Sequence, residues 1–223
     1  MEKYGKLPVD LGEIIVHPTE MMCYLYLPIS MRDGRMWQIP ERLEMYAPLV
    51  RKAAWDFEPD IPPKDFWHGY YVYLTVKTLF VTKDNPGNRP GVHSDGFGTE
   101  DINYIWYDTS PTVFYDQKFD IYPEINCGSV LKSLEAQAHD RFKVVYPCQH
   151  LLRLDQYCIH RSPDIDTPGI RTFVKVSISK ERYNLEGNSH NYLFDYNWKM
   201  YPREEVRNHP AFKEADYFKQ EEA

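Results

Sequence analysis

Runs of apolar residues, alternating or continuous, follow one another through the middle of the chain and predict β-strands. Residues 70–82, YYVYLTVKTLFVT, are β-branched and aromatic almost throughout, which is typical of a well-buried strand. INYIWYD at 102–108, TVFYDQKFDIYP, FKVVYP, LLRLDQYCIH and RTFVKVSISK come later, and runs such as KDNPGNRPG mark turns between them. Many strands separated by turns predict a β-sandwich or barrel.

Helical spacing of apolar residues occurs on either side of this region and once within it. The stretch from Pro40, PERLEMYAPLVRKAAW, has this spacing, and Pro48 is expected to divide it into two short helices. SVLKSLEAQA at 129–138 is the clearest short helix, with Ser129 as its expected N-cap. The chain from about Pro202 again has charged helical character. The expected fold class is therefore mainly β with flanking helices.

The N-terminal segment carries a hairpin signal. Asp33-Gly34 stands between two apolar-aromatic runs in CYLYLPISMRDGRMWQI, residues 23–39. We expect one domain, 1–223, made of an N-terminal hairpin and helices at 1–69, a β-barrel core at 70–180 and a C-terminal extension at 181–223.

Composition narrows the class of protein. The 223 residues are 43% hydrophobic and 15% aromatic, which is enough for a sizeable core. Acidic residues outnumber basic ones by 33 to 26, and this disfavours nucleic-acid binding that depends on phosphate contacts. The N-terminus lacks a signal-peptide pattern, and no apolar run is long enough to span a bilayer. The four cysteines show no CxxC spacing and fit reduced thiols. We expect a soluble, cytoplasmic protein without a membrane partner.

Strand parity places one histidine inside the predicted barrel. In LLRLDQYCIH, His160 shares the more apolar face with Leu154 and Cys158, because side chains alternate across a strand. A histidine at the end of a strand, just before a turn, is expected at the mouth of the cavity that the sheet encloses. The simpler alternative for His160 alone is a core histidine with satisfied hydrogen bonds.

Three other polar residues form a constellation with His160. His93 and Asp95 stand two residues apart in RPGVHSDGF, and Arg171 begins the strand that follows the turn after His160. Two imidazoles and one carboxylate form the facial triad of non-haem Fe(II) oxygenases, which leaves positions open for a bidentate 2-oxo acid and dioxygen. The planar guanidinium of Arg171 suits the distal carboxylate of that acid. Ordinary loop residues and a surface arginine are the simpler alternatives.

Because His93, Asp95, His160 and Arg171 occur in this order along the chain, the sequence resembles the Fe(II)- and 2-oxoglutarate-dependent dioxygenases on the double-stranded β-helix fold. That family carries H-x-D/E, a distal H and an R roughly ten residues beyond it, and the match covers roughly 70–180. The resemblance implies a jelly-roll or cupin-like core and a catalytic Fe(II) bound by His93, Asp95 and His160. It also implies 2-oxoglutarate as a cosubstrate held by Arg171, with O2 as the oxidant.

Two details of the family pattern concern the cosubstrate. In prolyl-hydroxylase-like members a tyrosine on the strand after H-x-D often bonds the same carboxylate. In INYIWYD, Tyr104 and Trp106 share one face, and the role is assigned to Tyr104 because its phenol can donate a hydrogen bond. Many members also have a small hydroxyl residue two positions after the arginine, where this chain has Phe173. The implied reaction oxidises a substrate, by hydroxylation in the simplest case, and releases succinate and CO2.

Two other functions are compatible with the same residues. A cupin-like metal protein would keep the three ligands and use Arg171 for its substrate or for structure. A non-catalytic β-sandwich module would bind no tight iron and would tolerate the loss of His93. As the substrate we slightly prefer a small molecule, because no extended basic groove is evident, although a nucleobase or a peptide side chain also fits. Aromatic residues in the end segments fit a homodimer.

Overall fold

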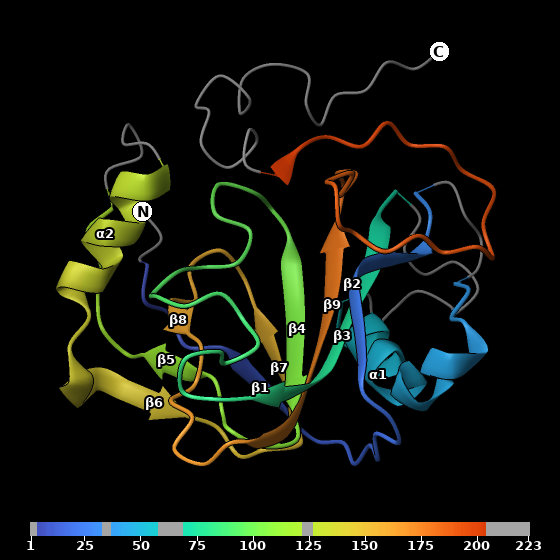
Figure 1. The fold of residues 1–223 in the computed structure, drawn as a ribbon. Coiled ribbons are helices and arrows are strands. Elements are labelled where there is room, and N and C mark those ends of the chain that lie inside the picture. The colour runs from blue at the N-terminus through green and yellow to red at the C-terminus, as the bar shows by residue number, and fades with distance from the viewer. Residues whose placement is uncertain (1–3, 33–36, 58–68, 122–126, 204–223) are drawn as a thin grey trace.

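The computed structural model describes residues 4–32, 37–57, 69–121 and 127–203, whose strands form two antiparallel sheets (Figure 1). The larger sheet has six strands in the order β1-β7-β4-β9-β3-β2, and the smaller has three in the order β6-β5-β8. The strands are β1 (Val9–Glu13), β2 (Met22–Ser30), β3 (Tyr71–Val81), β4 (Ile102–Tyr107), β5 (Val113–Tyr115), β6 (Lys143–Val145), β7 (His150–Leu154), β8 (His160–Arg161) and β9 (Gly169–Ser179). The helices are η1 (Glu41–Tyr46), α1 (Ala47–Phe57), α2 (Cys127–Gln137) and η3 (Asp140–Phe142).

From β3 onward the chain crosses repeatedly between the two sheets, which is the winding of a double-stranded β-helix. Strands β3, β4, β7 and β9 lie in the larger sheet, whereas β5, β6 and β8 lie in the smaller one. A bridge between His93 and His160 adds the segment after β3 to the smaller sheet, beside β8. The prediction of a mainly β, jelly-roll core with flanking helices is therefore confirmed.

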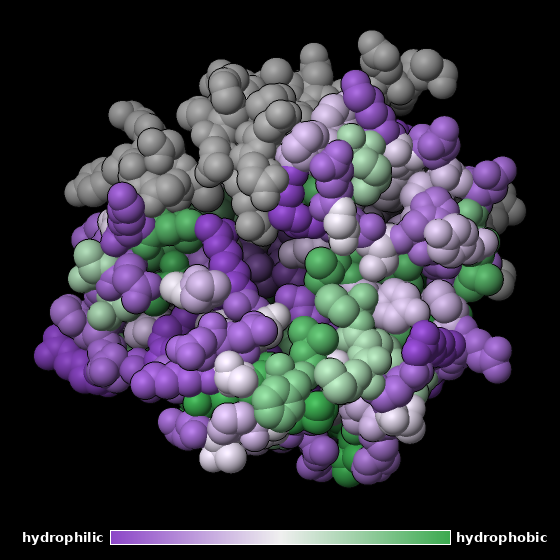
Figure 2. Space-filling model, viewed as in Figure 1, coloured by the Kyte–Doolittle hydropathy of each residue, from purple (hydrophilic) through white to green (hydrophobic). Residues whose placement is uncertain are grey.

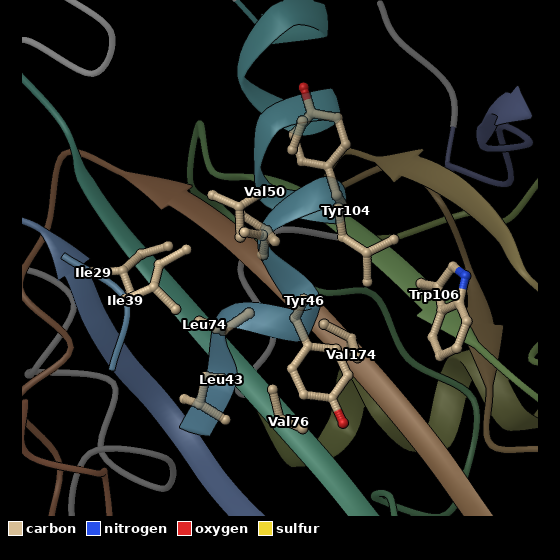
Figure 3. Close-up of a cluster of buried hydrophobic side chains, with 14 of the residues drawn as sticks. Ile29, Ile39, Leu43, Tyr46, Val50, Leu74, Val76, Tyr104, Trp106 and Val174 are labelled. Atoms are coloured by element: carbon tan, nitrogen blue, oxygen red, sulfur yellow. The ribbon is translucent and has the colours of Figure 1, made fainter. Parts of the chain in front are cut away.

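One face of the larger sheet is covered by η1 and α1 (Figures 1 and 3). Val174 and Val176 of β9 lie on this face and pack in one buried cluster with Tyr46 of η1 and Val50 of α1 (Figure 3). Helix α1 follows η1 directly, so the two short helices predicted from the sequence are present, the first as a 3-10 helix. Pro48 falls in the first turn of α1, where its missing N–H removes no helical hydrogen bond.

The opposite face of the larger sheet lines the space between the two sheets. On β9 this face carries Arg171, Phe173, Lys175 and Ser177, all of them buried, at alternating positions. Phe173 packs in a cluster with Phe114 of the smaller sheet. Strand β9 is therefore buried on both sides, with its apolar face against a helix and its more polar face inside the barrel.

Most predicted elements are present with small shifts, but two predicted strand regions differ. TVFYDQKFDIYP forms only the short strand β5 among its described residues. LLRLDQYCIH is not one strand, because β7 ends at Leu154 and β8 begins at His160. His160 nevertheless points inward as predicted and is only 5% exposed. Helix α2 begins at Cys127, two residues earlier than predicted, and this places Ser129 inside the helix rather than at its N-cap.

The predicted N-terminal hairpin forms only in part. Strand β2 pairs with β3, and residues 37–39 do not form a strand, although Gln38 N donates to Ile29 O at 2.7 Å. The expected turn at Asp33-Gly34 and the expected helical segment beyond 203 lie outside the described residues. Within the described ranges, the structure contains no helix with the length and apolar character that a membrane span requires.

Candidate metal centre

Backbone pairing brings two histidines together at the edge of the smaller sheet. His93 N donates to His160 O at 2.9 Å, and His160 N donates to His93 O at 2.8 Å. This pairing sets the two imidazole rings side by side, with centroids 4.6 Å apart. Asp95 follows His93 by two residues, and the ligand atoms of the three side chains lie within 4.8 Å of one another. The structure thus brings together the three residues that the sequence selected as metal ligands.

Both imidazoles are oriented by hydrogen bonds to backbone carbonyls. Nδ1 of His93 donates to Gly91 O at 2.8 Å, and Nδ1 of His160 donates to Cys158 O at 3.0 Å. A proton held on Nδ1 leaves the lone pair on Nε2, which is the tautomer that a metal-binding histidine needs. Each ring is therefore fixed in position and in tautomer before any metal binds.

Burial and neighbouring charges set the ligands in their metal-binding protonation states. Burial, together with the nearby His160, lowers the pKa of His93 to about 4. Burial likewise lowers the pKa of His160. Burial alone would oppose ionisation of Asp95, but Lys175 and the two histidines outweigh it and hold its pKa well below the usual range. At neutral pH the cluster is two neutral imidazoles and one carboxylate, so a metal need not displace protons.

Lys175 is a fourth member of this cluster, and the sequence did not assign it to the site. It lies on the inward face of β9, and its Nζ donates to Asp95 Oδ2 at 3.1 Å and to Tyr26 OH at 3.2 Å. Its side chain is 8% exposed. Burial would lower the pKa of Lys175, but Asp95 and Tyr26 raise it above the ordinary value. The cluster therefore contains a buried cation that already binds one of its ligands.

Tyr26 reaches the site through an irregularity in β2. The register between β2 and β3 shifts between Tyr24 and Leu27, and Tyr26 has a φ of 47°. A tyrosine in this left-handed region is strained, and such strain persists where surrounding contacts hold it. Here Tyr26 N donates to the Thr75 hydroxyl at 2.9 Å, and the phenol binds Lys175. The bulge places an N-terminal side chain beside the candidate ligands.

The cluster opens into a cavity of about 390 Å³ between the two sheets. His93, Asp95 and His160 line it, with Ile105 and Phe173 as its apolar wall. A hollow bordered largely by hydrophilic residues opens near the middle of the face shown in Figure 2. Of the described residues, five with basic side chains also line the cavity: Lys77, Arg89, Arg161, Lys175 and Arg203.

Arg171 lies on the same face of β9 as Lys175 but deeper in the barrel. It is 2% exposed, and its Nε donates to the carbonyls of Thr109 and Ser110 at 3.2 and 3.0 Å. Burial lowers the pKa of Arg171 to about 10. Its guanidinium Cζ lies 5.4 Å from the centroid of Phe173, whose ring lines the cavity, whereas Arg171 is not among the lining residues. Arg171 therefore belongs to the layer beneath the cavity.

The predicted role of Tyr104 requires a correction. Tyr104 lies on the face of β4 that meets α1, where its hydroxyl donates to Asp56 Oδ2 at 2.9 Å (Figure 3). Arg153 Nη1 donates to the same oxygen at 2.9 Å. Parity correctly grouped Tyr104 with Trp106 on one face, but that face is turned away from the metal ligands. Tyr104 ties the sheet to the helix and is not placed to hold a cosubstrate.

We expect Tyr104→Phe to lower the free energy of unfolding by about 2 kcal/mol, because the phenylalanine keeps the packing and loses one hydrogen bond to a charged group. Urea unfolding would measure this loss. Metal binding by the same variant, followed calorimetrically, should match that of the wild type. If Tyr104→Phe kept its stability but bound metal more weakly, Tyr104 would have a role at the metal centre and not in packing against α1.

The two imidazoles and one carboxylate form a three-ligand set suited to a first-row divalent metal and leave further coordination positions free.

No family model matches the sequence, and no curated protein matches it. Among solved structures, EvdO2 from Micromonospora carbonacea var. aurantiaca is 18% identical, with 63% of this chain and 62% of that chain covered and a TM-score of 0.38. A bsmA homolog from Methylobium petroleophilum PM1 is 13% identical, covering 72% of this chain and 64% of that chain, with a TM-score of 0.35. The chain spans less than two thirds of the length of either structure.

Proposed function

We propose that the protein is a non-haem Fe(II)- and 2-oxoglutarate-dependent dioxygenase that oxidises, and most simply hydroxylates, a small molecule. The observation that carries the proposal is the convergence of His93, Asp95 and His160 on a cavity inside a double-stranded β-helix. A facial set of two histidines and one carboxylate holds Fe(II) while leaving room for a bidentate cosubstrate and dioxygen.

The buried Arg171 supports 2-oxoglutarate as the cosubstrate. Its Nη2 is buried and has no hydrogen-bond partner among the described residues, and no carboxylate there lies within ion-pair distance of the guanidinium. Asp108 favours the charged guanidinium, but only from beyond ion-pair distance. A buried cation without a close counter-ion is costly, and a carboxylate that enters the barrel would relieve the cost. Lys77, which lines the cavity on β3 directly opposite Phe173, is the alternative partner for that carboxylate.

The residues of this chain divide the work as follows. When bound, Fe(II) and 2-oxoglutarate supply the oxidising chemistry with dioxygen. His93, Asp95 and His160 hold the metal. The far carboxylate of the cosubstrate is held either by Arg171, in the layer beneath the cavity, or by Lys77 at the cavity wall. Ile105 and the ring of Phe173 shield the reacting centre from bulk water at the cavity wall.

The test is anaerobic addition of 2-oxoglutarate to the Fe(II)-loaded protein, followed through the visible metal-to-ligand charge-transfer band. We expect a band in the wild type, and we expect Arg171→Ala to weaken 2-oxoglutarate binding by at least about tenfold, because a charge-assisted hydrogen bond is lost. Lys77→Ala run alongside identifies which cation binds the carboxylate. Bound iron without a band in the wild type would favour a cupin-like metal enzyme that does not use 2-oxoglutarate. A protein that binds no iron would contradict both functions.

A further inference from the structure

Among the described residues, the lining of the candidate cavity has the opposite charge to the chain as a whole. The formal net charge is −7, yet the described lining residues include five basic side chains and one carboxylate, Asp95. Low-dielectric walls concentrate the field of such a cluster, and this attracts anions from solution. A dianionic cosubstrate requires some of this positive charge, and only the cations that it does not engage can bind the substrate.

Three of the five lining cations are accounted for by an ion pair with a carboxylate or by the proposed cosubstrate site. Lys175 is paired with Asp95. Arg161 holds Asp164 through two hydrogen bonds of 2.9 and 2.6 Å. Lys77 donates to the Gly87 carbonyl and to Asn88 Oδ1, at 3.0 and 3.1 Å, and is the alternative site for the cosubstrate. Arg89 and Arg203 have no role in the proposed metal and cosubstrate site.

Arg89 is an exposed arginine held at the cavity by its backbone. Its carbonyl accepts a 2.6 Å hydrogen bond from the Ser162 hydroxyl, which fixes it beside the end of β8. Within the described part of the chain, no side chain pairs with its guanidinium. Arg89 and His93 line the same cavity. Arg89 is therefore a lining cation that is free to bind an anion near the metal ligands.

Arg203 approaches the cavity from the C-terminal segment. Its Nη2 donates to the Glu186 carbonyl at 3.2 Å and to Asn188 Oδ1 at 2.6 Å, which anchors the side chain. It also lines an adjoining hollow together with Asp95 and Lys175. An arginine held in this way loses little conformational entropy when it binds a ligand, because its guanidinium is already oriented.

We propose that Arg89 and Arg203 form an anion subsite at the mouth of the cavity, and that the oxidised substrate is a small molecule carrying a carboxylate or phosphate group. The inference rests on the proposed function for the reaction itself, but the subsite is defined by the cavity charges alone. Two guanidinium groups from different segments can bind one oxyanion through paired hydrogen bonds and so orient the substrate toward the metal. The acidic chain disfavours a polyanion, which would contact a wider surface.

The test uses protein saturated with Zn(II) and 2-oxoglutarate, and three probes that share one aromatic ring: phenyl phosphate, benzoate and benzyl alcohol. Ligand-observed NMR gives their dissociation constants and shows in the same sample whether 2-oxoglutarate stays bound. We expect at least one anionic probe to bind about tenfold or more tightly than benzyl alcohol, and the stronger anion identifies the group as phosphate or carboxylate. Equal binding of all three probes would overturn the proposal.

Variants locate the subsite. The double variant Arg89→Ala/Arg203→Ala should lose the preference for anions, and Arg89→Glu alone should reverse it while altering only an exposed side chain. Arg51→Ala removes the same charge from the exposed surface of α1 and should leave the preference intact. An equal loss in Arg51→Ala would mean that net charge, not the subsite, attracts the probes.

The same experiment separates this inference from the proposed function. If 2-oxoglutarate does not bind but the anion preference still depends on Arg89 and Arg203, the subsite stands and the dioxygenase proposal fails. If 2-oxoglutarate binds without any anion preference among the probes, the dioxygenase proposal stands and the subsite is rejected.

Discussion

His160→Ala is expected to abolish tight metal binding. The imidazole is 5% exposed, and Nδ1 is held by Cys158 O, so Nε2 is one of three preoriented ligands. Loss of a partner that only orients a ligand already costs 10- to 100-fold in metal affinity. Loss of the ligand itself should therefore cost more than about 100-fold, because His93 and Asp95 alone complete too little of the coordination shell.

Calorimetric titration of the metal-free protein with Zn(II), and with Fe(II) under nitrogen, would measure this loss. His17→Ala is the matched control, because His17 is an exposed histidine outside the cluster. Its affinity should equal that of the wild type. Full metal affinity in His160→Ala would show that the metal binds elsewhere, and the three-residue site would have to be abandoned.

Much of the barrel and of the ligand set could be predicted from local sequence. The run that forms β3 is apolar on both faces, and only a strand buried on both sides suits such a run. The His-x-Asp spacing was also local, and backbone pairing of His93 with His160 brought the two histidines together. The inward direction of His160 was predicted correctly, but from parity along a strand that ends at Leu154, so the prediction was right for a reason that does not hold. Parity could group Tyr104 with Trp106, but which face meets α1 depends on packing between distant segments.

The polar environment of the ligands could not be predicted in the same way. Lys175 shares a strand face with Arg171, so its inward direction was available from parity, but its partner Asp95 is 80 residues away. Tyr26 reaches Lys175 only because β2 bulges out of register with β3. Tertiary contacts of this kind leave no periodic signal in the sequence, although they determine how the Asp95 carboxylate is held.

These contacts would make Lys175 and a bound metal compete for one carboxylate, that of Asp95. Lys175 Nζ lies 3.1 Å from Asp95 Oδ2, and the same oxygen lies 3.9 Å from His160 Nε2. The oxygen that faces the histidine is therefore the one that Lys175 already binds. In the metal-free protein the ammonium stabilises the carboxylate, and after metal binding two positive charges lie close together. Lys175 should thus stabilise the empty site and weaken metal binding.

Lys175→Met is expected to change stability and affinity in opposite directions. Methionine keeps the apolar stem but leaves Asp95 without its cation, so the metal-free variant should lose about 3 kcal/mol of unfolding free energy. Metal affinity should rise by about tenfold or more, because the repulsion between the ammonium and the metal is removed. Bound metal should then restore much of the lost stability, since a ligand that binds only the folded state stabilises it.

Urea unfolding in EDTA and with saturating Zn(II), together with calorimetric metal titration, would test both effects. Lys180→Met is the matched control, because its ion pair with Glu100, 2.9 Å long, is exposed. An exposed pair contributes little, so this control should lose no more than about 0.5 kcal/mol and keep its metal affinity. Weaker metal binding in Lys175→Met would instead mean that Lys175 orients Asp95 for the metal, and the ammonium would then be a support of the site rather than a competitor for it.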